Sequence, residues 1–191
     1  MPELIQGVQQ AHPAKRIQVF FEDESRFGQQ GVMTNVWARK GTRPQMVRQC
    51  EYKNAYIIGA VCPETGQAEG LICSHLNTQM MNIFLSQLSE TLGENVQALL
   101  VWDGAGYHRS STLEVPENIT LVQLPAYSPE LNPIELLWLY MKSHYWANRV
   151  FPTEADLLNY AVEMWGRVCF DQELMKTLCH ASYAVNYQSD Q

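Results

Sequence analysis

Lysine and arginine are missing from a long stretch of this chain, between residues 54 and 108. Residues 1–60 carry eight basic and five acidic side chains, whereas residues 61–191 carry five basic and fifteen acidic ones. The net charge of −7 therefore conceals a basic N-terminal third. Because polyanions bind where positive charge gathers, a nucleic acid partner is expected to contact this third. A chance asymmetry on a solvated surface explains the distribution equally well.

Long hydrophobic runs and paired cysteines are also lacking. No apolar run approaches the length of a membrane span, and the N-terminus lacks the apolar core of a signal peptide. The five cysteines form no CxxC pair, which argues against a zinc site and a disulfide framework and predicts free thiols in a reducing compartment. No GxSxG motif marks a serine nucleophile. The chain has 191 residues, which is long enough for one globular domain. Its hydrophobic content of 46% is typical of a globular protein.

The first predicted strand runs from Ile17 to Asp23 and follows a polar lead-in over residues 1–16. The two-residue alternation of a strand places Asp23 at the end of its apolar face, with Ile17. Glu22 and Glu24 point to the other side and are interpreted as solvated charges. Asp23 is therefore the acid of this strand that most needs a partner.

A second strand that ends in an acid lies in the middle of the chain. The apolar run Leu99–Trp102 predicts a strand buried on both faces, and Asp103 ends it. A carboxylate at the carboxyl end of such a strand lies at the edge of the sheet, where open α/β sheets place their sites. The alternative is an Asx-type turn that closes the strand.

The third acid is Glu135, near the start of a predicted helix. Asn132 suits the N-cap of this helix and Pro133 its first position. An acid in the first turn also satisfies free N–H groups and the helix dipole, so Glu135 has a structural explanation of its own. Trp138 and Lys142 follow it on the same side of the helix.

Further elements predict an α/β fold. They are an antiparallel hairpin over 55–62 and 70–73, a helix capped by Thr78 and ended by Gly93, a strand over 119–124, a helix capped by Thr153, and a short helix around 174–178. Asp23 and Asp103 on adjacent parallel strands and Glu135 on a covering helix can then meet at one edge of the sheet. Three carboxylates there would repel one another unless divalent cations neutralised them. Hard oxygen ligands favour Mg²⁺ or Mn²⁺, and two such ions promote in-line phosphoryl displacement.

A basic, aromatic-bearing connection lies near the N-terminal third. The segment Val36–Pro44 suggests the connection of a hairpin. Its cations are suited to DNA phosphates and its tryptophan to a sugar or base, although a surface packing platform is an alternative. The candidate DNA-binding residues are Trp37, Arg39, Lys40, Arg43 and Arg48.

Three blocks of the chain, residues 20–28, 101–108 and 124–138, resemble the signature blocks of the bacterial insertion-sequence branch of the mariner transposase superfamily. Residues 37–44 are similar to the first hairpin of that family. The resemblance implies a ribonuclease H-like α/β fold over residues 17–191, with a mixed five-stranded sheet flanked by helices. It implies that Asp23, Asp103 and Glu135 are the DDE metal ligands, holding two Mg²⁺ or Mn²⁺ ions. It further implies His108 and Asn132 as supporting groups or phosphate contacts.

The implied activity is that of a DNA transposase in the bacterial cytoplasm: metal-dependent hydrolysis at transposon ends, then strand transfer of the 3′-OH into target DNA by a homodimer. About sixteen residues precede the first strand, so recognition of the ends is expected from a separate or fused helix-turn-helix region. Two alternatives remain open. One is another ribonuclease H-like endonuclease, and the other is a catalytically silent, transposase-derived DNA-binding module.

Overall fold

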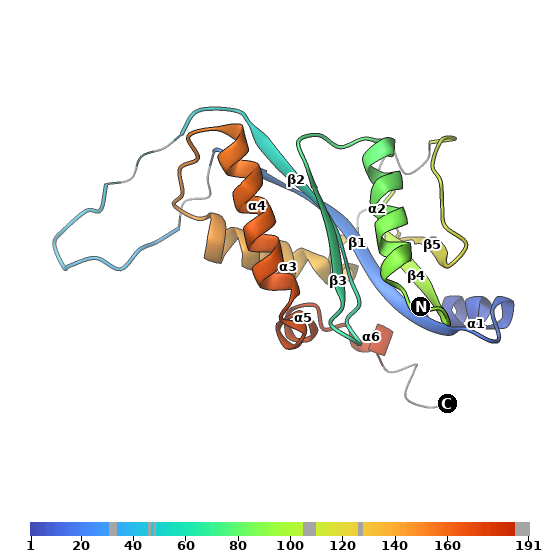
Figure 1. The fold of residues 1–191 in the computed structure, drawn as a ribbon. Coiled ribbons are helices and arrows are strands. Elements are labelled where there is room, and N and C mark those ends of the chain that lie inside the picture. The colour runs from blue at the N-terminus through green and yellow to red at the C-terminus, as the bar shows by residue number, and fades with distance from the viewer. Residues whose placement is uncertain (31–33, 46, 48, 105–109, 126–127, 186–191) are drawn as a thin grey trace.

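The computed structural model describes residues 1–30, 34–45, 47, 49–104, 110–125 and 128–185. Five strands form one mixed sheet in the order β3-β2-β1-β4-β5 (Figure 1). The strands are β1 (Arg16–Gly28), β2 (Asn54–Val61), β3 (Ala68–Cys73), β4 (Val96–Trp102) and β5 (Ile119–Gln123). The helices are α1 (Pro2–Ala11), α2 (Thr78–Thr91), α3 (Ile134–Met141), α4 (Glu154–Cys169), α5 (Gln172–Leu178) and α6 (Ser182–Val185). None of them is long and apolar enough to cross a membrane, within the part of the chain that is described.

The central strand β1 divides the sheet into an antiparallel and a parallel half. It pairs antiparallel with β2, which pairs antiparallel with β3. On its other side it pairs parallel with β4, which pairs parallel with β5. The predicted hairpin over 55–62 and 70–73 is thus confirmed as β2 and β3. The parallel pairing stops at Phe21 and Val101, so residue 23 of β1 and the carboxyl end of β4 lie at the same edge of this half.

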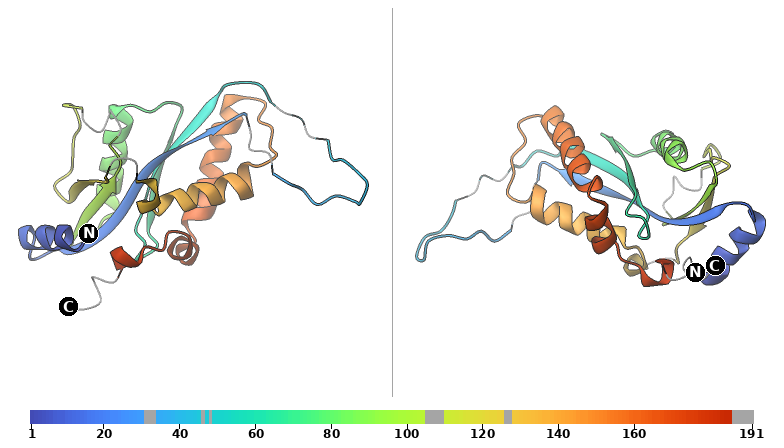
Figure 2. Two further views of the ribbon diagram at one scale, coloured as in Figure 1. Left: turned by 180° about the vertical axis from the view of Figure 1, so that it is seen from behind. Right: turned by 60° about the horizontal axis from the view of Figure 1, so that its bottom comes forward.

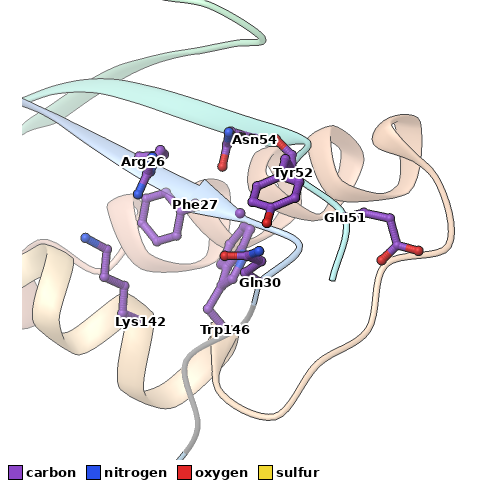
Figure 3. Close-up of a pocket in the computed structure, with 9 residues that line it drawn as sticks. Arg26, Phe27, Gln30, Glu51, Tyr52, Asn54, Lys142 and Trp146 are labelled. Carbon is purple, nitrogen blue, oxygen red and sulfur yellow. Dashed lines mark hydrogen bonds between the residues drawn. The ribbon is translucent and has the colours of Figure 1, made fainter. Parts of the chain in front are cut away.

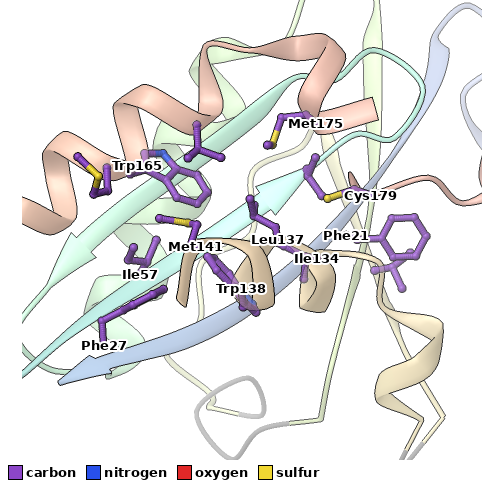
Figure 4. Packing of buried hydrophobic residues seen from close by; sticks show 14 of the residues in the cluster. Phe21, Phe27, Ile57, Ile134, Leu137, Trp138, Met141, Trp165, Met175 and Cys179 are labelled. Atoms are coloured by element: carbon purple, nitrogen blue, oxygen red, sulfur yellow. The ribbon is translucent and has the colours of Figure 1, made fainter. Parts of the chain in front are cut away.

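Helices cover both faces of the sheet and bury a hydrophobic core on each (Figures 1 and 2). Helix α2 covers one face, where Phe84 and Leu88 pack with Phe20 of β1. Helices α3, α4 and α5 cover the other face, which holds the larger core. Figure 4 shows Leu137 and Trp138 of α3 in this core, together with Trp165 of the neighbouring helix α4. Burial of these aromatic and aliphatic side chains fixes α3 against β1.

A long excursion separates β1 from β2 and extends away from the rest of the molecule (Figures 1 and 2). Every residue from 34 to 45 is exposed to solvent. The two ends of the excursion are anchored on the connection between α3 and α4. The Nδ2 of Asn148 donates to the Oγ1 of Thr34 at 3.2 Å, and the Nε2 of Gln49 donates to the carbonyl of Phe151 at 2.6 Å. Residues 36–44 therefore belong to the connection of the β1–β2 hairpin.

The lead-in before β1 contains helix α1 over residues 2–11, which buries Ile5 in the larger core. One local prediction needs correction. Helix α2 is capped by Asn77 rather than Thr78, since the Asn77 side chain accepts the backbone N–H of Met80 at 2.9 Å. The cap of α4 is confirmed at Thr153, which forms a capping box with Asp156.

Candidate active site

The strands β1 and β4 carry Asp23 and Asp103 toward the same edge of the sheet. Phe21 of β1 pairs with Val101 of β4, and both side chains lie in the core under α3. The alternation of a strand therefore returns Asp23, two residues later, to the face under α3. Asp103 follows the last residue of β4 and is exposed. Asp103 thus follows the end of β4, as the sequence predicted. The prediction that the first strand ends at Asp23 is wrong, because β1 pairs with β2 as far as Gly28; Asp23 lies just beyond the last residue pair between β1 and β4.

Helix α3 adds Glu135 above the same face. The helix buries Ile134, Leu137 and Trp138 against the sheet, which leaves Glu135 exposed in its first turn. Among the charges near Asp23, that of Glu135 raises the pKa of the aspartate most. Asp23 and Glu135 are therefore close enough to repel each other, although 112 positions separate them along the chain.

Asp23 has the most strongly perturbed carboxyl group on this face. Burial, followed by repulsion from Glu135, raises its pKa from 3.8 to about 7. The indole Nε1–H of Trp138 donates to the Oδ2 of Asp23 at 2.8 Å and opposes this rise. A partly buried carboxyl group whose pKa lies near 7 is typical of a functional site. The hydrogen bond also fixes the orientation of the carboxyl group.

The Trp138→Phe variant tests the hydrogen bond to Asp23. The substitution keeps an aromatic ring in the core but removes the only indole donor to the carboxylate among the described contacts. We expect the pKa of Asp23 to rise further, by about one pH unit, because the charged form loses a stabilising donor. The pKa is measured by an NMR titration of the Asp23 carboxyl carbon. A pKa that stays the same or falls would contradict this role for Trp138.

Asn132 lies one residue farther from α3 than the sequence suggested. The helix begins at Ile134 with Pro133 at its N-cap, so the prediction that Asn132 is the N-cap is wrong. The side chain of Asn132 is buried, and its Nδ2 donates to the backbone carbonyl of Glu22 at 2.8 Å. Asn132 thus ties the chain entering α3 to strand β1, directly beside Asp23. This contact joins the chain just before α3, which carries Glu135, to the strand that carries Asp23.

Glu22 is not a solvated charge, which corrects a second prediction. Its side chain is fully buried on the α2 side of the sheet, and both carboxylate oxygens lack a hydrogen-bond partner among the described residues. Burial, and then the charges of Glu24, Asp23 and Asp103, raise the pKa of Glu22 well above its usual range. The alternation of β1 was predicted correctly. However, helix α2 covers the sheet face opposite Asp23, so Glu22 on that face is not in contact with water.

The three predicted ligands are only partly gathered. Asp23 interacts with Glu135, and Asp103 acts on Glu22. Among the described residues, no group of three or more His, Cys, Asp or Glu side chains is arranged to hold a metal ion.

Two of the predicted site residues, His108 and Arg48, lie outside the described residues. The remaining candidates for DNA contact are exposed on the excursion between β1 and β2, which extends away from the sheet in Figure 1; they are Trp37, Arg39, Lys40 and Arg43.

Two further residues belong to the site although the sequence analysis gave them no role. Trp138 donates a hydrogen bond to Asp23. Lys142 lies near Asp23 and Glu135. Burial lowers the pKa of Lys142, and the negative charges of the two acids oppose this lowering only in part. The signal for both was their helical spacing of three and seven residues from Glu135. That spacing places them on one side of the helix, but it does not show that this side faces β1.

Comparisons with known proteins bear on the family and the fold of the chain. A family described as DDE superfamily endonuclease matches residues 18–158. The uncharacterized protein y4pE/y4sA of Sinorhizobium fredii (strain NBRC 101917 / NGR234) is 38% identical over 114 residues, which are 60% of this chain and 84% of that protein.

Solved structures of the Mos1 transposase share the fold. Its paired-end complex with the left transposon end matches 94% of this chain with a TM-score of 0.63 and 15% identity. A pre-cleavage Mos1 transpososome matches the whole chain with a TM-score of 0.62 and 14% identity. The match covers 56% and 61% of the respective Mos1 chains. At these identities the likeness establishes the predicted ribonuclease H-like fold, and this chain spans little more than half the length of the Mos1 chains.

Proposed function

Because the chain belongs to the DDE superfamily endonuclease family, we propose that it is the catalytic domain of a DNA transposase. The proposed domain spans residues 17–191. It hydrolyses phosphodiester bonds at transposon ends and joins the freed 3′-OH to target DNA. The observation that carries this proposal is the repelling pair Asp23 and Glu135 at the sheet edge where Asp103 ends the neighbouring strand.

The residues at this edge fit hard divalent cations. Asp23 and Glu135 offer carboxylate oxygens, and their repulsion is relieved by positive charge between them. Asp103 supplies a third carboxylate from an exposed position, so its side chain is accessible to an ion. When bound by Asp23, Asp103 and Glu135, two Mg²⁺ or Mn²⁺ ions would stabilise the attacking and leaving oxygens of the displacement. A mariner Mos1 paired-end complex with Mg is among the structures that share the fold, with a TM-score of 0.64.

The other residues of the edge hold the acids in place. Trp138 orients Asp23 through its indole N–H, and Asn132 fixes the entry to α3 against the backbone of Glu22. Both contacts join α3 to β1, so they limit the separation of Glu135 from Asp23. These residues are positioning groups, and neither needs to touch DNA in the proposed reaction.

The excursion between β1 and β2 is proposed to contact DNA. Arg39, Lys40 and Arg43 are exposed there, and Trp37 is fully exposed. Such cations are suited to phosphates, and an exposed tryptophan is suited to stacking on a base. Arg48 belongs to the same proposal by its sequence position. Since strand transfer in this class pairs two DNA ends, the proposed active form is a homodimer.

The experiment that tests the function measures nicking of supercoiled plasmid and joining of a 3′-OH oligonucleotide, each with and without Mg²⁺ or Mn²⁺. Wild type is expected to do both only with metal, and Asp103→Asn to lose about a hundredfold or more of each rate. Glu130→Gln, which changes an exposed acid before α3, serves as the matched control and keeps both activities.

Two outcomes would overturn the proposal in different ways. Metal-dependent nicking without any joining would identify another kind of ribonuclease H-like endonuclease. Equal behaviour of wild type and Asp103→Asn would identify a silent DNA-binding module.

A further inference from the structure

A pocket of about 310 Å³ opens beside the candidate active site, at the carboxyl end of β1 (Figure 3). Arg26 and Phe27 of β1 line it from one side, three and four residues after Asp23. Lys142 and Trp146 line it from the π-helical turn η3 (Lys142–Trp146), which continues α3. The pocket is therefore built on the same strand and the same helical segment as the acids.

The base of the pocket is aromatic and is connected to the acids through ring contacts. The rings of Phe27 and Trp146 lie 4.5 Å apart between centroids. Phe27 also meets Trp138 edge-on at 6.2 Å, and Trp138 donates to Asp23. Packed aromatic rings of this kind are rigid, so the pocket holds a fixed position relative to Asp23.

Two cations stand at the end of the pocket nearer the acids. The Nζ of Lys142 lies 5.4 Å from the centroid of the Phe27 ring. Arg26 is exposed, and its charge acts on Lys142, so the two cations are near each other. No salt bridge of the described residues includes either one. The acid that lines the pocket, Glu51, lies at the opposite end from both cations in Figure 3.

We propose that this pocket binds one nucleotide of the DNA strand that enters the active site, with its phosphate on Arg26 and Lys142 and its base against the aromatic side chains. The proposal rests on the proposed function and names a subsite of it. Two adjacent cations that form no salt bridge among the described residues are suited to a phosphate, because they repel each other until an anion lies between them.

The opposite end of the pocket is suited to a base. Tyr52 is 82% exposed and lines the pocket together with the amide side chains of Gln30 and Asn54. An exposed ring offers a stacking surface, and amides offer donors and acceptors for a base edge. The volume is at the lower end for ligand pockets, which fits a single nucleotide better than a duplex.

The test measures how tightly a fluorescently labelled single-stranded oligonucleotide binds the full chain without divalent metal. Binding is monitored by fluorescence anisotropy at several salt concentrations. The double variant Arg26→Gln, Lys142→Met is expected to bind about tenfold more weakly, with a salt dependence reduced by about one contact. Tyr52→Ala is expected to bind about tenfold more weakly with an unchanged salt dependence, because it removes stacking and no charge. Tyr52 is so exposed that this variant folds normally.

The matched control removes two cations elsewhere. Arg167→Gln with Lys176→Met loses the same charge from surface ion pairs on α4 and α5, and its affinity should stay within about twofold of wild type. If the pocket variants bind the oligonucleotide as tightly as this control, the proposal of a nucleotide subsite is wrong. Because binding is measured without metal, its result is independent of nicking. A wild type that fails to nick, with the pocket variants still weakened, would overturn the proposed function alone.

Discussion

The Asp23→Asn variant is expected to lose metal-dependent nicking and, at the same time, to be more stable than wild type without metal at about pH 8. Nicking should fall by about a hundredfold or more, because a proposed metal ligand loses its charge. Stability should rise by about 2 kcal/mol, because burial and the charge of Glu135 both disfavour the ionised carboxyl group. The asparagine oxygen still accepts the indole N–H of Trp138.

The sign of the pH dependence follows from the two pKa values of Asp23. In the unfolded chain the pKa is 3.8, and in the folded protein it is about 7. Between these values the folded protein holds the proton more tightly, so the free energy of unfolding of wild type falls as the pH rises. The variant lacks this decrease. Urea denaturation at about pH 4, 6 and 8 should therefore show a stability difference that grows with pH.

Addition of Mg²⁺ distinguishes a metal ligand at Asp23 from a carboxylate that is only destabilised by burial and by the charge of Glu135. The melting temperature of wild type should rise with Mg²⁺, since an ion that binds only the folded state stabilises it. The variant should respond much less. A variant that is destabilised at every pH, or that gains as much from Mg²⁺ as wild type, would contradict the assignment of Asp23.

The second large effect is expected at Glu22. Glu22→Gln should raise the free energy of unfolding by about 1–3 kcal/mol at about pH 8, because both carboxylate oxygens are buried without partners and face three other acids. The folded-state pKa is raised above 4.5, so wild type loses stability as the pH rises through that window. At about pH 4 the two proteins should be equally stable. Urea denaturation at both pH values measures the difference.

The control for Glu22 is again Glu130→Gln, since Glu130 is exposed. This variant should stay within about 0.5 kcal/mol of wild type at either pH. A Glu22→Gln variant that is less stable than wild type at about pH 8 would show that the buried carboxylate is charged and bound to a partner. The gains at Glu22 and Asp23 should not add fully, because the two charges repel each other.

Much of the candidate site was predictable from local patterns. The alternation from Ile17 placed Asp23 on the face that α3 covers, and the short apolar run before Asp103 placed that acid at the carboxyl end of a buried strand. Parallel pairing of β1 and β4 then brings Asp23 and the end of β4 to one edge, although β1 itself continues to Gly28. These features depend on neighbours in sequence and on periodicity, which a single sequence carries.

The rest depends on contacts between distant segments. Burial of Glu22 follows from helix α2 lying over that face, and no pattern around residue 22 shows it. The hydrogen bond from the Nδ2 of Asn132 to the backbone of Glu22 spans 110 residues, so no local pattern shows it, whereas the Oδ1 of the same side chain accepts the backbone N–H of Ile134 at 3.4 Å. The nucleotide pocket joins β1, the segment before β2 and the end of α3, so its residues are scattered along the chain.

We propose that Asp23, Asp103 and Glu135 jointly hold the divalent ions. The most direct test of this proposal is the anomalous scattering of Mn²⁺ in crystals of the protein soaked with the ion, with Asp23→Asn crystals treated in the same way. We expect Mn²⁺ within bonding distance of carboxylate oxygens of all three residues in wild type and greatly reduced occupancy in the variant. Mn²⁺ bound elsewhere, or bound equally in both crystals, would contradict it.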